Sequence, residues 1–330
     1  MDKIMVSIVC ITYNHEQFIA DAIDGFLMQK TNFDFEILIH DDASTDKTAD
    51  IIKKYELKFP NIIKPIYQKE NQYSKGIKVV DLNWKRAKGK YIALCEGDDY
   101  WSDPFKLQKQ VDYMENNSDC TLCTHAVEKV TINKVRIGYE RPYDRDIKAP
   151  TTDLILGGGY FVGTTSLLFP RNLIESTPDF YLNASVGDYP LQIYLASKGY
   201  AYYMNEVMGA YRIGVEGSWS QRQINGNDKR EKQIYHTEQV INMLEGFNKY
   251  TNYKYNDAII KKKNYYYFKI ALLKKDWKMV RISKYYQSAG FKDKVTMFIK
   301  MYFPSYKQQL FRNLINKNLK EFRSENRNLS

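Results

Sequence analysis

Short apolar runs alternate with amphipathic segments through the first part of this chain, and this alternation limits the fold more than any other feature of the sequence. The apolar, β-branched runs predict strands at residues 4–12, 35–39, 62–68 and 91–95. The segments between them carry apolar residues at helical spacing. Strands that alternate with helices of about 10–15 residues predict a parallel, doubly wound α/β sheet.

The later part of the chain carries further strand and helix patterns. Strands are predicted at residues 120–130, 133–139, 165–169 and 200–205, and helices at residues 103–116 and 190–198. From about residue 228 onward the pattern is helical, with basic and tyrosine-rich faces. We therefore predict two domains, an α/β domain at residues 1–225 and a basic, tyrosine-rich helical C-terminal region at residues 226–330.

Membrane-spanning and exported proteins are not favoured by the sequence. No stretch approaches the roughly 20 apolar residues of a membrane helix, and no small-residue cleavage site follows the apolar run at residues 4–11. The four cysteines suit a reducing compartment. Cys120 and Cys123 form a single C-x-x-C inside a predicted strand, so a zinc or redox site is not favoured. We expect a cytoplasmic location.

The positive charge is concentrated in the C-terminal third of the chain. Residues 1–220 hold 25 basic and 30 acidic side chains, whereas residues 221–330 hold 24 basic and 9 acidic ones. Basic, aromatic, amphipathic helices suit an anionic membrane surface, so one hypothesis is peripheral attachment to the inner leaflet. Solvated helices whose aromatic residues pack as core are equally consistent with the pattern. Nucleic acid is the least favoured partner.

Three acidic side chains, Glu96, Asp98 and Asp99, follow the apolar run at residues 91–95. Clustered carboxylates at a strand end repel one another, which costs free energy unless a cation lies among them. Mg²⁺ and Mn²⁺ take oxygen ligands and combine one or two carboxylates with substrate phosphates. The pattern predicts a metal-bridged phosphate site, with a solvated acidic turn as the alternative.

Two other predicted strands also end in polar residues: Thr12, Tyr13 and Asn14 after the first strand, and Asp41 and Asp42 after the second. In parallel α/β sheets, ligands bind beyond the carboxyl ends of the strands. An aspartate can accept the N3–H of a uracil ring, an adjacent aromatic can stack on that ring, and helix N-termini favour phosphate. We expect ligand contacts here, with helix capping as the alternative task of the two aspartates.

The order and spacing of four segments resemble the family 2 glycosyltransferases, which have the GT-A fold. These segments are residues 6–14, 36–46, 87–92 and 96–101. The likeness is strong over about residues 4–115, looser to about 220, and ends before 230. It implies a GT-A-like doubly wound mixed sheet with a C-terminal helical extension. It also implies that the nucleotide is bound by Thr12, Tyr13, Asn14, Asp41, Asp42, Glu96 and Asp98.

The resemblance also implies the metal and the catalytic base. The acidic motif of the family usually reads Asp-x-Asp-Asp, and this chain has Glu96 at its first position. Asp98 and Asp99 are therefore the expected contacts of Mn²⁺ or Mg²⁺. The family's base is an aspartate ahead of a short helix, and Asp188 fits that place. The alternative task of Asp188 is to cap the helix that begins at residues 189–190.

Three further residues are candidates for the acceptor side or a mobile loop. Arg212 belongs to a segment, continuing to residue 220, that resembles a late loop of many family members. It would add charge next to the diphosphate, or lie in an ordinary surface loop. Trp101 is expected either to pack against the acceptor sugar or to be a half-buried core aromatic. Thr165 lies in a segment, residues 160–166, that would line the acceptor pocket by family analogy.

The resulting hypothesis is a metal-dependent, inverting glycosyltransferase. It would move a sugar from a nucleoside diphosphate sugar, with UDP as the expected nucleotide, to a glycan or lipid-linked acceptor in polysaccharide synthesis. One alternative is a nucleotidyltransferase, although such enzymes usually open with a glycine-rich basic loop, which residues 12–15 do not provide. Another is a non-catalytic nucleotide-sugar binding protein on the same scaffold.

Overall fold

The computed structural model describes residues 4–218, 221 and 228–302. The chain divides into two compact units: Met1–Gly226 with Asn242–Ile259, and Asn227–Ile241 with Ile260–Ser330. The predicted domain boundary at residues 225 and 226 lies outside the described residues. Within the described ranges, every helix is too short or too polar to cross a membrane.

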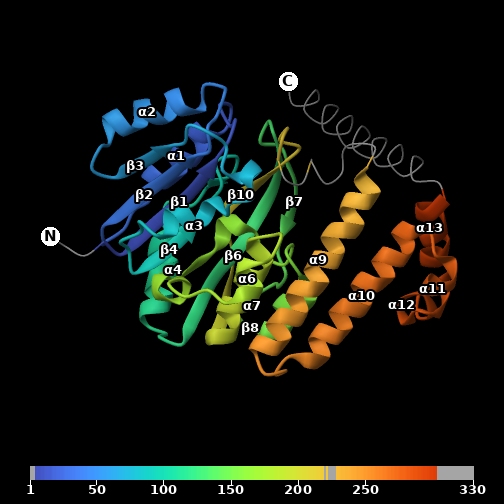
Figure 1. The fold of residues 1–330 in the computed structure, drawn as a ribbon. Helices are drawn as coiled ribbons and strands as arrows, with labels where there is room; N and C mark the ends of the chain where they lie inside the picture. Colours follow the sequence, from blue (N-terminus) through green and yellow to red (C-terminus); the bar gives the residue numbers. More distant parts are fainter. Residues whose placement is uncertain (1–3, 219–220, 222–227, 303–330) are drawn as a thin grey trace, which may run out of the picture. The chain divides into compact units, whose positions relative to one another are not determined.

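The first half of the central sheet is parallel and doubly wound, as predicted (Figure 1). Its strands, in the spatial order β3-β2-β1-β4, are β1 (Val6–Thr12), β2 (Phe35–Asp41), β3 (Ile63–Tyr67) and β4 (Tyr91–Leu94). The connecting helices are α1 (Ile19–Leu27), α2 (Thr48–Lys58) and α3 (Val79–Trp84), with a short η1 (Tyr73–Lys75) before α3. Helix α1 begins at Ile19, because residues 13–18 form a turn after the end of β1.

The second half of the sheet is mixed rather than parallel. Its strands are β5 (Tyr100–Trp101), β6 (Cys120–Thr131), β7 (Arg136–Glu140), β8 (Ile147–Ala149), β9 (Leu168–Pro170) and β10 (Tyr200–Ile213). Strand β10 is parallel to β6, while β5, β7, β8 and β9 each run antiparallel to a neighbour. The alternation rule fails here because several links are too short for a parallel crossover, which needs a dozen or more residues.

Further helices lie between these strands. They are α4 (Lys106–Glu115), α5 (Thr151–Gly157), η2 (Thr164–Ser166), η3 (Arg171–Ile174), α6 (Asp179–Leu182) and α7 (Asp188–Lys198). The strand predicted at residues 165–169 therefore starts as a helical turn, and β10 extends well past the predicted residue 205.

Helix α1 packs its apolar stripe into the core of the first unit. Ile19, Ile23 and Phe26 are fully buried at helical spacing. Phe26 meets the ring of Trp101 edge-on, with ring centroids 4.9 Å apart. A Cβ at Gly25 would lie only 2.9 Å from the main-chain oxygen of Trp101, so the glycine lets the helix approach the strand that follows the acidic turn.

Helices make up residues 228–302, the described C-terminal part of the chain, as expected (Figure 1). They are α9 (Lys229–Tyr250), α10 (Asn256–Lys274), α11 (Trp277–Ile282), α12 (Lys284–Gln287) and α13 (Phe291–Tyr302). Phe268 and Ala271 of α10 pack with Val280 and Met301 in a small core of the second unit. Aromatic residues such as Trp277 surround this core, so part of the aromatic content is structural.

Candidate active site

The polar ends of three strands meet at one edge of the sheet, as the sequence predicts. Thr12 at the end of β1 is in register with Asp41 at the end of β2. The N–H of Gly97, in the middle of the acidic turn, donates to the main-chain oxygen of Ile11 at 2.9 Å. This bond places Glu96, Asp98 and Asp99 directly beside the end of β1.

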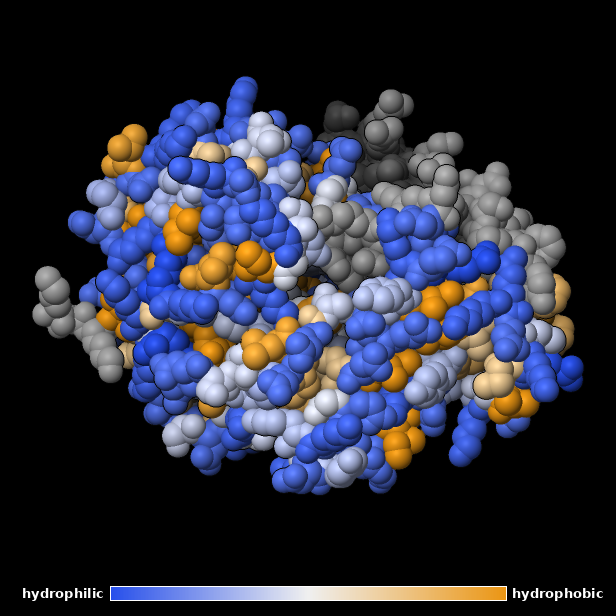
Figure 2. Space-filling model, in the orientation of Figure 1, coloured by the Kyte–Doolittle hydropathy of each residue, from blue (hydrophilic) through white to orange (hydrophobic). Residues whose placement is uncertain are grey.

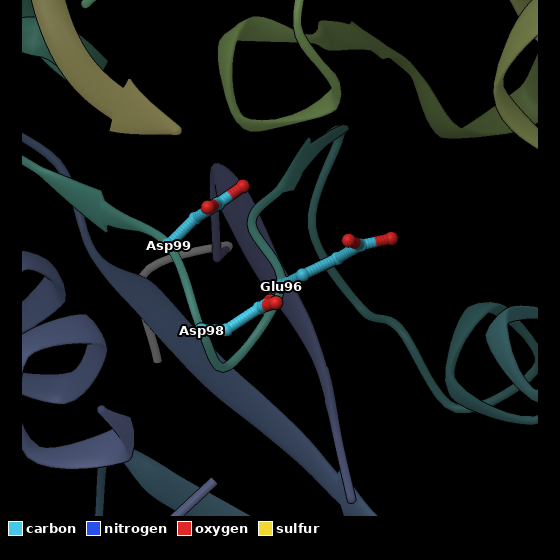
Figure 3. Close-up of side chains that lie close together, drawn as sticks. All are labelled: Glu96, Asp98 and Asp99. Carbon is cyan, nitrogen blue, oxygen red and sulfur yellow. The ribbon is translucent and has the colours of Figure 1, made fainter. Parts of the chain in front are cut away.

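The three acidic side chains arise from a single turn after β4 (Figure 3). One carboxylate oxygen from each of Glu96, Asp98 and Asp99 can be chosen so that all three lie within 4.8 Å of one another. Asp98 and Asp99 are buried, whereas Glu96 reaches solvent. Oxygen donors at this spacing suit a hard divalent cation such as Mn²⁺ or Mg²⁺.

The acidic turn is electrostatically strained when it carries full negative charge. Loss of hydration beside the surrounding protein, and then the charges of Asp98 and Asp188, raise the pKa of Glu96 to about 8, although its side chain still reaches solvent. Burial, Asp98 and Glu96 raise the pKa of Asp99 well above its usual range. A cation bound among these groups would lower both pKa values, since it favours the ionised form.

Arg212 holds the acidic turn from below. Its main-chain N–H donates to Asp99 Oδ1 at 2.9 Å, and its side-chain Nη1 donates to the main-chain oxygen of Asp98 at 2.6 Å. Nη2 pairs with the carboxylate of Asp21. The expected position of Arg212 in a late loop is wrong: the residue lies in β10, is 2% exposed, and spends its guanidinium on protein partners. Residues 219 and 220 of that segment lie outside the described residues.

The residues after β1 differ in how free they are to meet a ligand. Thr12 is buried, and Tyr13 is 40% exposed, so its ring is available for stacking. Asn14 has a left-handed backbone with φ of 56°. Its Oδ1 accepts from the N–H of Thr45 at 2.8 Å, and its own N–H donates to Ser44 Oγ at 2.9 Å. Asn14 therefore joins the loops after β1 and β2.

Asp41 and Asp42 are both buried and serve different loops. Asp41 accepts a hydrogen bond from Ser44 Oγ, and burial raises the pKa of its carboxyl. Asp42 accepts from the N–H groups of Gln72 at 2.8 Å and Tyr73 at 3.0 Å. Asp42 thereby fixes the loop before α3, which leaves Asp41 as the better placed of the two for a nucleotide.

Neither Asp41 nor Asp42 caps α2. The helix begins at Thr48, whose main-chain N–H donates a hydrogen bond to Asp46 Oδ1 at 2.9 Å. This side-chain bond satisfies one of the free N–H groups at the helix start.

Asp188 opens α7 and lies near the acidic turn. Loss of hydration raises its pKa, partly offset by backbone N–H groups at the start of the helix. Its charge contributes to the raised pKa of Glu96, which precedes it by 92 positions in the sequence numbering. The fold therefore brings the candidate base into the field of the candidate metal ligands.

Trp101 and Thr165 form the core beneath the acidic turn. Trp101 is 2% exposed and donates its Nε1–H to the main-chain oxygen of Thr165 at 2.9 Å. Thr165 is fully buried and donates to Cys95 Sγ at 3.0 Å. The core alternative is therefore the one observed for Trp101, and neither side chain is open to an acceptor.

Lys106 is a buried cation that the sequence gives no reason to notice. Its Nζ lies 3.9 Å from the centre of the Trp101 ring. Burial lowers the pKa of Lys106 to about 7. A lysine early in an amphipathic helix ordinarily lies in water, so only the tertiary structure reveals this position.

The glycine run at residues 157–159 is shaped around Asp188 and Phe161. A Cβ at Gly157 would lie 2.2 Å from a ring carbon of Phe161. Gly158 has φ of 78°, a left-handed conformation that favours glycine. The Cβ position of Gly159 lies 3.4 Å from Asp188 Oδ2. The loop can thus pass directly over the candidate base.

An open hollow of about 330 Å³ lies beside this loop. Its lining residues are Lys129, Tyr139, Glu140, Arg141, Pro142, Gly157, Tyr160 and Phe161. Tyr160 is 72% exposed and Tyr139 43% exposed. Although Tyr160 is exposed, loss of hydration beside the neighbouring protein, followed by the charges of Asp188 and Glu140, raises the pKa of its phenol. The phenol therefore lies within the field of both carboxylates. Sequence reasoning included Tyr160 but missed the residues of β6 and β7, because their pairing is not visible in the sequence.

Comparison with known proteins identifies the family. The profile described as glycosyl transferase family 2 matches residues 7–175. The chain belongs to glycosyl transferase family 2. The matched range contains the acidic turn and the polar ends of β1 and β2.

Relatives with matching sequences come from several bacteria. An uncharacterised protein of Mycobacterium bovis is 36% identical over 220 residues, which is 65% of this chain and 60% of that protein. A Bacillus subtilis protein named for teichuronic acid biosynthesis, TuaG, is 30% identical over 217 residues, or 64% of this chain and 80% of that protein. The match thus spans about 60% of the length of the first relative.

Solved structures of distant sequence share the fold. Residues 1–349 of Staphylococcus aureus TarS, in complex with UDP-GlcNAc, match with a TM-score of 0.58 and 15% identity over 90% of this chain and 79% of that one. The mannosyltransferase PcManGT of Pyrobaculum calidifontis, in complex with GDP-Man and Mn²⁺, matches with a TM-score of 0.54 and 13% identity over 96% and 86%. These matches confirm the GT-A-like α/β fold with its helical C-terminal region.

Proposed function

We propose that this protein is a glycosyltransferase that moves a sugar from a nucleoside diphosphate sugar to a hydroxyl group. The observation that carries the proposal is the acidic turn at the sheet edge, where carboxylate oxygens of Glu96, Asp98 and Asp99 lie within 4.8 Å of one another. The charge of Asp188 acts on Glu96 of this turn. One set of carboxylates is suited to a metal and a diphosphate, and the other to proton removal. Family membership supports the same reaction.

The donor site is proposed at the sheet edge formed by β1, β2 and β4. Tyr13 is exposed for stacking on a base, Asp41 can accept from a ring N–H, and Thr12 lies between them and the acidic turn. UDP is the proposed nucleotide. The TarS complex with UDP-GlcNAc supports it by similarity of fold, while the PcManGT complex contains GDP-Man.

Asp98 and Asp99 are the proposed ligands of Mn²⁺ or Mg²⁺, with Glu96 at the side of the nucleotide. When bound, the cation would offset the charge that develops on the departing diphosphate, an effect worth several kcal/mol. Arg212 holds Asp98 and Asp99 through the main chain and one carboxylate oxygen, so the turn keeps its shape as ligands enter. The presence of Mn²⁺ in the PcManGT complex is consistent with this assignment.

Asp188 is the proposed general base. It takes the proton of the acceptor hydroxyl as that oxygen attacks the anomeric carbon and the bond to the diphosphate breaks. A single in-line displacement of this kind inverts the anomeric configuration. The raised pKa of Asp188 makes it a stronger base than an ordinary carboxylate, which favours proton removal near neutral pH.

The acceptor is proposed to lie in the hollow beside the glycine run. Tyr139 and Tyr160 expose aromatic rings that can pack on sugar faces, and Gly159 lets the acceptor approach Asp188. The name of the relative TuaG favours a glycan or lipid-linked acceptor in the synthesis of a cell-surface polysaccharide.

The C-terminal region is proposed to attach the enzyme to the cytoplasmic face of an anionic membrane. Phe291, Val295 and Phe298 lie at i, i+4 and i+7 of α13 and are 85%, 41% and 45% exposed. Lys292 and Lys294 flank this apolar stripe. Figure 2 shows hydrophobic patches set among hydrophilic ones over the C-terminal helices. We propose that this C-terminal region begins near residue 226.

The proposal is tested by measuring product formation from a panel of nucleotide sugars with added Mn²⁺ and with chelator. Release of UDP from a UDP-sugar, dependent on the metal, is the expected result. Release of pyrophosphate from a nucleoside triphosphate and sugar phosphate would instead indicate a nucleotidyltransferase. Donor binding without turnover under any acceptor would indicate a binding protein.

A further inference from the structure

His15 lies next to the acidic turn although nothing in its sequence spacing suggests a ligand site. Its Nε2 is 3.9 Å from Asp98 Oδ2, with the two side chains 13% and 9% exposed. Its other ring nitrogen, Nδ1, is buried and has no hydrogen-bond partner among the described residues. An Nδ1 without a partner and an Nε2 facing a carboxylate favour the tautomer with the proton on Nε2.

Gly97 makes this approach possible. A Cβ at Gly97 would lie 3.1 Å from His15 Nδ1 and 2.6 Å from Thr12 Oγ1. Only glycine lets the acidic turn lie against both side chains in their observed places. The side chains of His15 and Thr12 therefore explain why glycine is required between Glu96 and Asp98.

The main chain holds the His15 ring in position. The N–H of His15 donates to Thr48 Oγ1 at 2.8 Å. The main-chain oxygen of His15 accepts from Phe18 at 2.9 Å and from Ile19 at 2.8 Å at the start of α1. The ring also meets that of Phe18 edge-on, with centroids 6.4 Å apart. None of the hydrogen bonds depends on the side chain at position 15, so the loop can survive substitution there.

We propose that His15 is a positioning residue for the cation site. Its Nε2–H is the donor that faces Asp98 Oδ2, and donation to that oxygen would leave the other carboxylate oxygen for the cation. In this structure Nε2 and Oδ2 are 3.9 Å apart, which is longer than a hydrogen bond, so the donation is proposed for the cation-bound state. Groups that hydrogen-bond metal ligands typically change metal affinity by about 10–100-fold when they are lost. This inference rests on the proposed metal-dependent function.

The test measures Mn²⁺ affinity by calorimetric titration of the full chain without donor or acceptor. We compare the wild type with His15→Phe, His15→Gln and His15→Asn. The Gln amide nitrogen occupies nearly the place of Nε2, whereas that of Asn matches Nδ1. We expect Mn²⁺ to bind about tenfold more weakly to His15→Phe and His15→Asn, and His15→Gln to retain most of the affinity. Thermal melting of each variant without metal reports whether the fold is kept.

The outcomes separate the inference from the proposed function. Unchanged affinity in a folded His15→Phe variant would overturn the role of His15 and leave the metal site intact. An equally large loss in His15→Gln would also overturn it, because it would show that ring packing matters rather than the donor. Absence of Mn²⁺ binding by the wild type would remove the metal from the proposed function, and the role of His15 with it.

Discussion

The main-chain oxygen of Asp98 accepts a hydrogen bond from Arg212 Nη1 at 2.6 Å, across 114 positions of the sequence. The main-chain N–H of the same arginine donates to the carboxylate of Asp99, and its Nη2 pairs with the carboxylate of Asp21 in α1. Its guanidinium also lies 4.9 Å from the ring centre of Phe18. One buried side chain therefore connects α1, β10 and the acidic turn.

Arg212→Lys is expected to lower the free energy of unfolding by about 3 kcal/mol, since an ammonium group cannot reach both Asp21 and the Asp98 oxygen. Urea unfolding measures the loss. The exposed Arg136 offers a matched control, and Arg136→Lys should stay within about 0.5 kcal/mol of the wild type. Equal stability of the two variants would contradict the connecting role of Arg212.

Asp188→Asn is expected to reduce turnover by about 10²–10⁴-fold while leaving the dissociation constant of UDP largely unchanged. The amide keeps the shape of the side chain but cannot take a proton. Steady-state transfer rates and UDP titration measure the two effects separately. Full turnover in this variant would exclude Asp188 as the base.

The pH dependence of the wild-type rate gives a second test of the base. A base must be ionised, and the pKa of Asp188 is raised, so the rate should fall as pH falls through that raised value. The midpoint of the acid limb of the pH–rate profile is expected to lie above the pKa range of an ordinary aspartate. A limb at the usual aspartate pKa would contradict the assignment.

The stability of the metal-free protein should fall as pH rises. The pKa of Glu96 is about 8 in the folded state against an ordinary value of 4.5, and that of Asp99 is also raised. Stability from these protonated groups is fully present below their unfolded pKa values and is lost as pH rises through the folded ones. Melting temperatures measured with chelator between about pH 5.5 and pH 8.5 follow this loss.

Glu96→Gln should flatten this pH dependence, because the side chain at position 96 no longer ionises. The exposed Glu231 provides a charge-matched control, and Glu231→Gln should keep the wild-type slope. Added Mn²⁺ should raise the melting temperature of the wild type most at the alkaline end, where the ligands are ionised. A slope unchanged by Glu96→Gln would show that the acidic turn does not titrate as described.

The two outer glycines of the run at residues 157–159 should respond differently to alanine. Gly157→Ala has no room beside Phe161 and is expected to destabilise the fold by about 1–3 kcal/mol. Gly159→Ala makes an ordinary contact with Asp188, so its melting temperature should stay close to that of the wild type. Its turnover should fall about tenfold, since the methyl group crowds the base and the acceptor. The reverse pattern would place the acceptor elsewhere.

Binding to vesicles should depend on Lys292 and Lys294 of α13. The full chain is expected to sediment with vesicles that contain anionic lipid and to remain free with neutral vesicles. Each lysine near an anionic surface contributes about 1 kcal/mol, so replacing both by Gln should weaken binding about 30-fold. The matched control replaces Lys53 and Lys54 of α2 by Gln. Equal binding to both kinds of vesicle would contradict the membrane proposal.

The sequence predicts those parts of the fold that depend on local pattern. Strands β1, β2 and β4 are almost entirely buried runs rich in apolar residues, whereas β3 is fully buried only at Ile63. The acidic turn is visible because three charges end such a run, and that does not depend on distant residues. The mixed second half of the sheet is less predictable, since β5 and β8 are only 2 and 3 residues long and are defined by their partners.

The roles of individual side chains in the site depend on contacts between segments that are distant in the sequence, so the sequence alone does not predict them. The sequence suggests that Arg212 lies in a loop, whereas in the structure it belongs to β10 and donates to the main-chain oxygen of Asp98. Trp101 follows the acidic turn, and its place in the sequence fits a ligand contact as well as a core position. The close approach of Gly25 to its main chain shows that α1 covers this strand. His15 has no ligand spacing along the chain, and only the folded structure shows that it lies beside Gly97 and Asp98.

The two sides of the site come from separate stretches of the chain. Residues 12–99 supply the candidate donor and cation contacts, whereas the hollow beside the glycine run is lined by residues that lie between positions 129 and 161. Under the proposed assignment, mutations in the second stretch would change which hydroxyl is glycosylated without altering how the activated sugar is recognised. Under the same assignment, a lineage carrying this scaffold would diversify its surface polymers while keeping a single precursor pool.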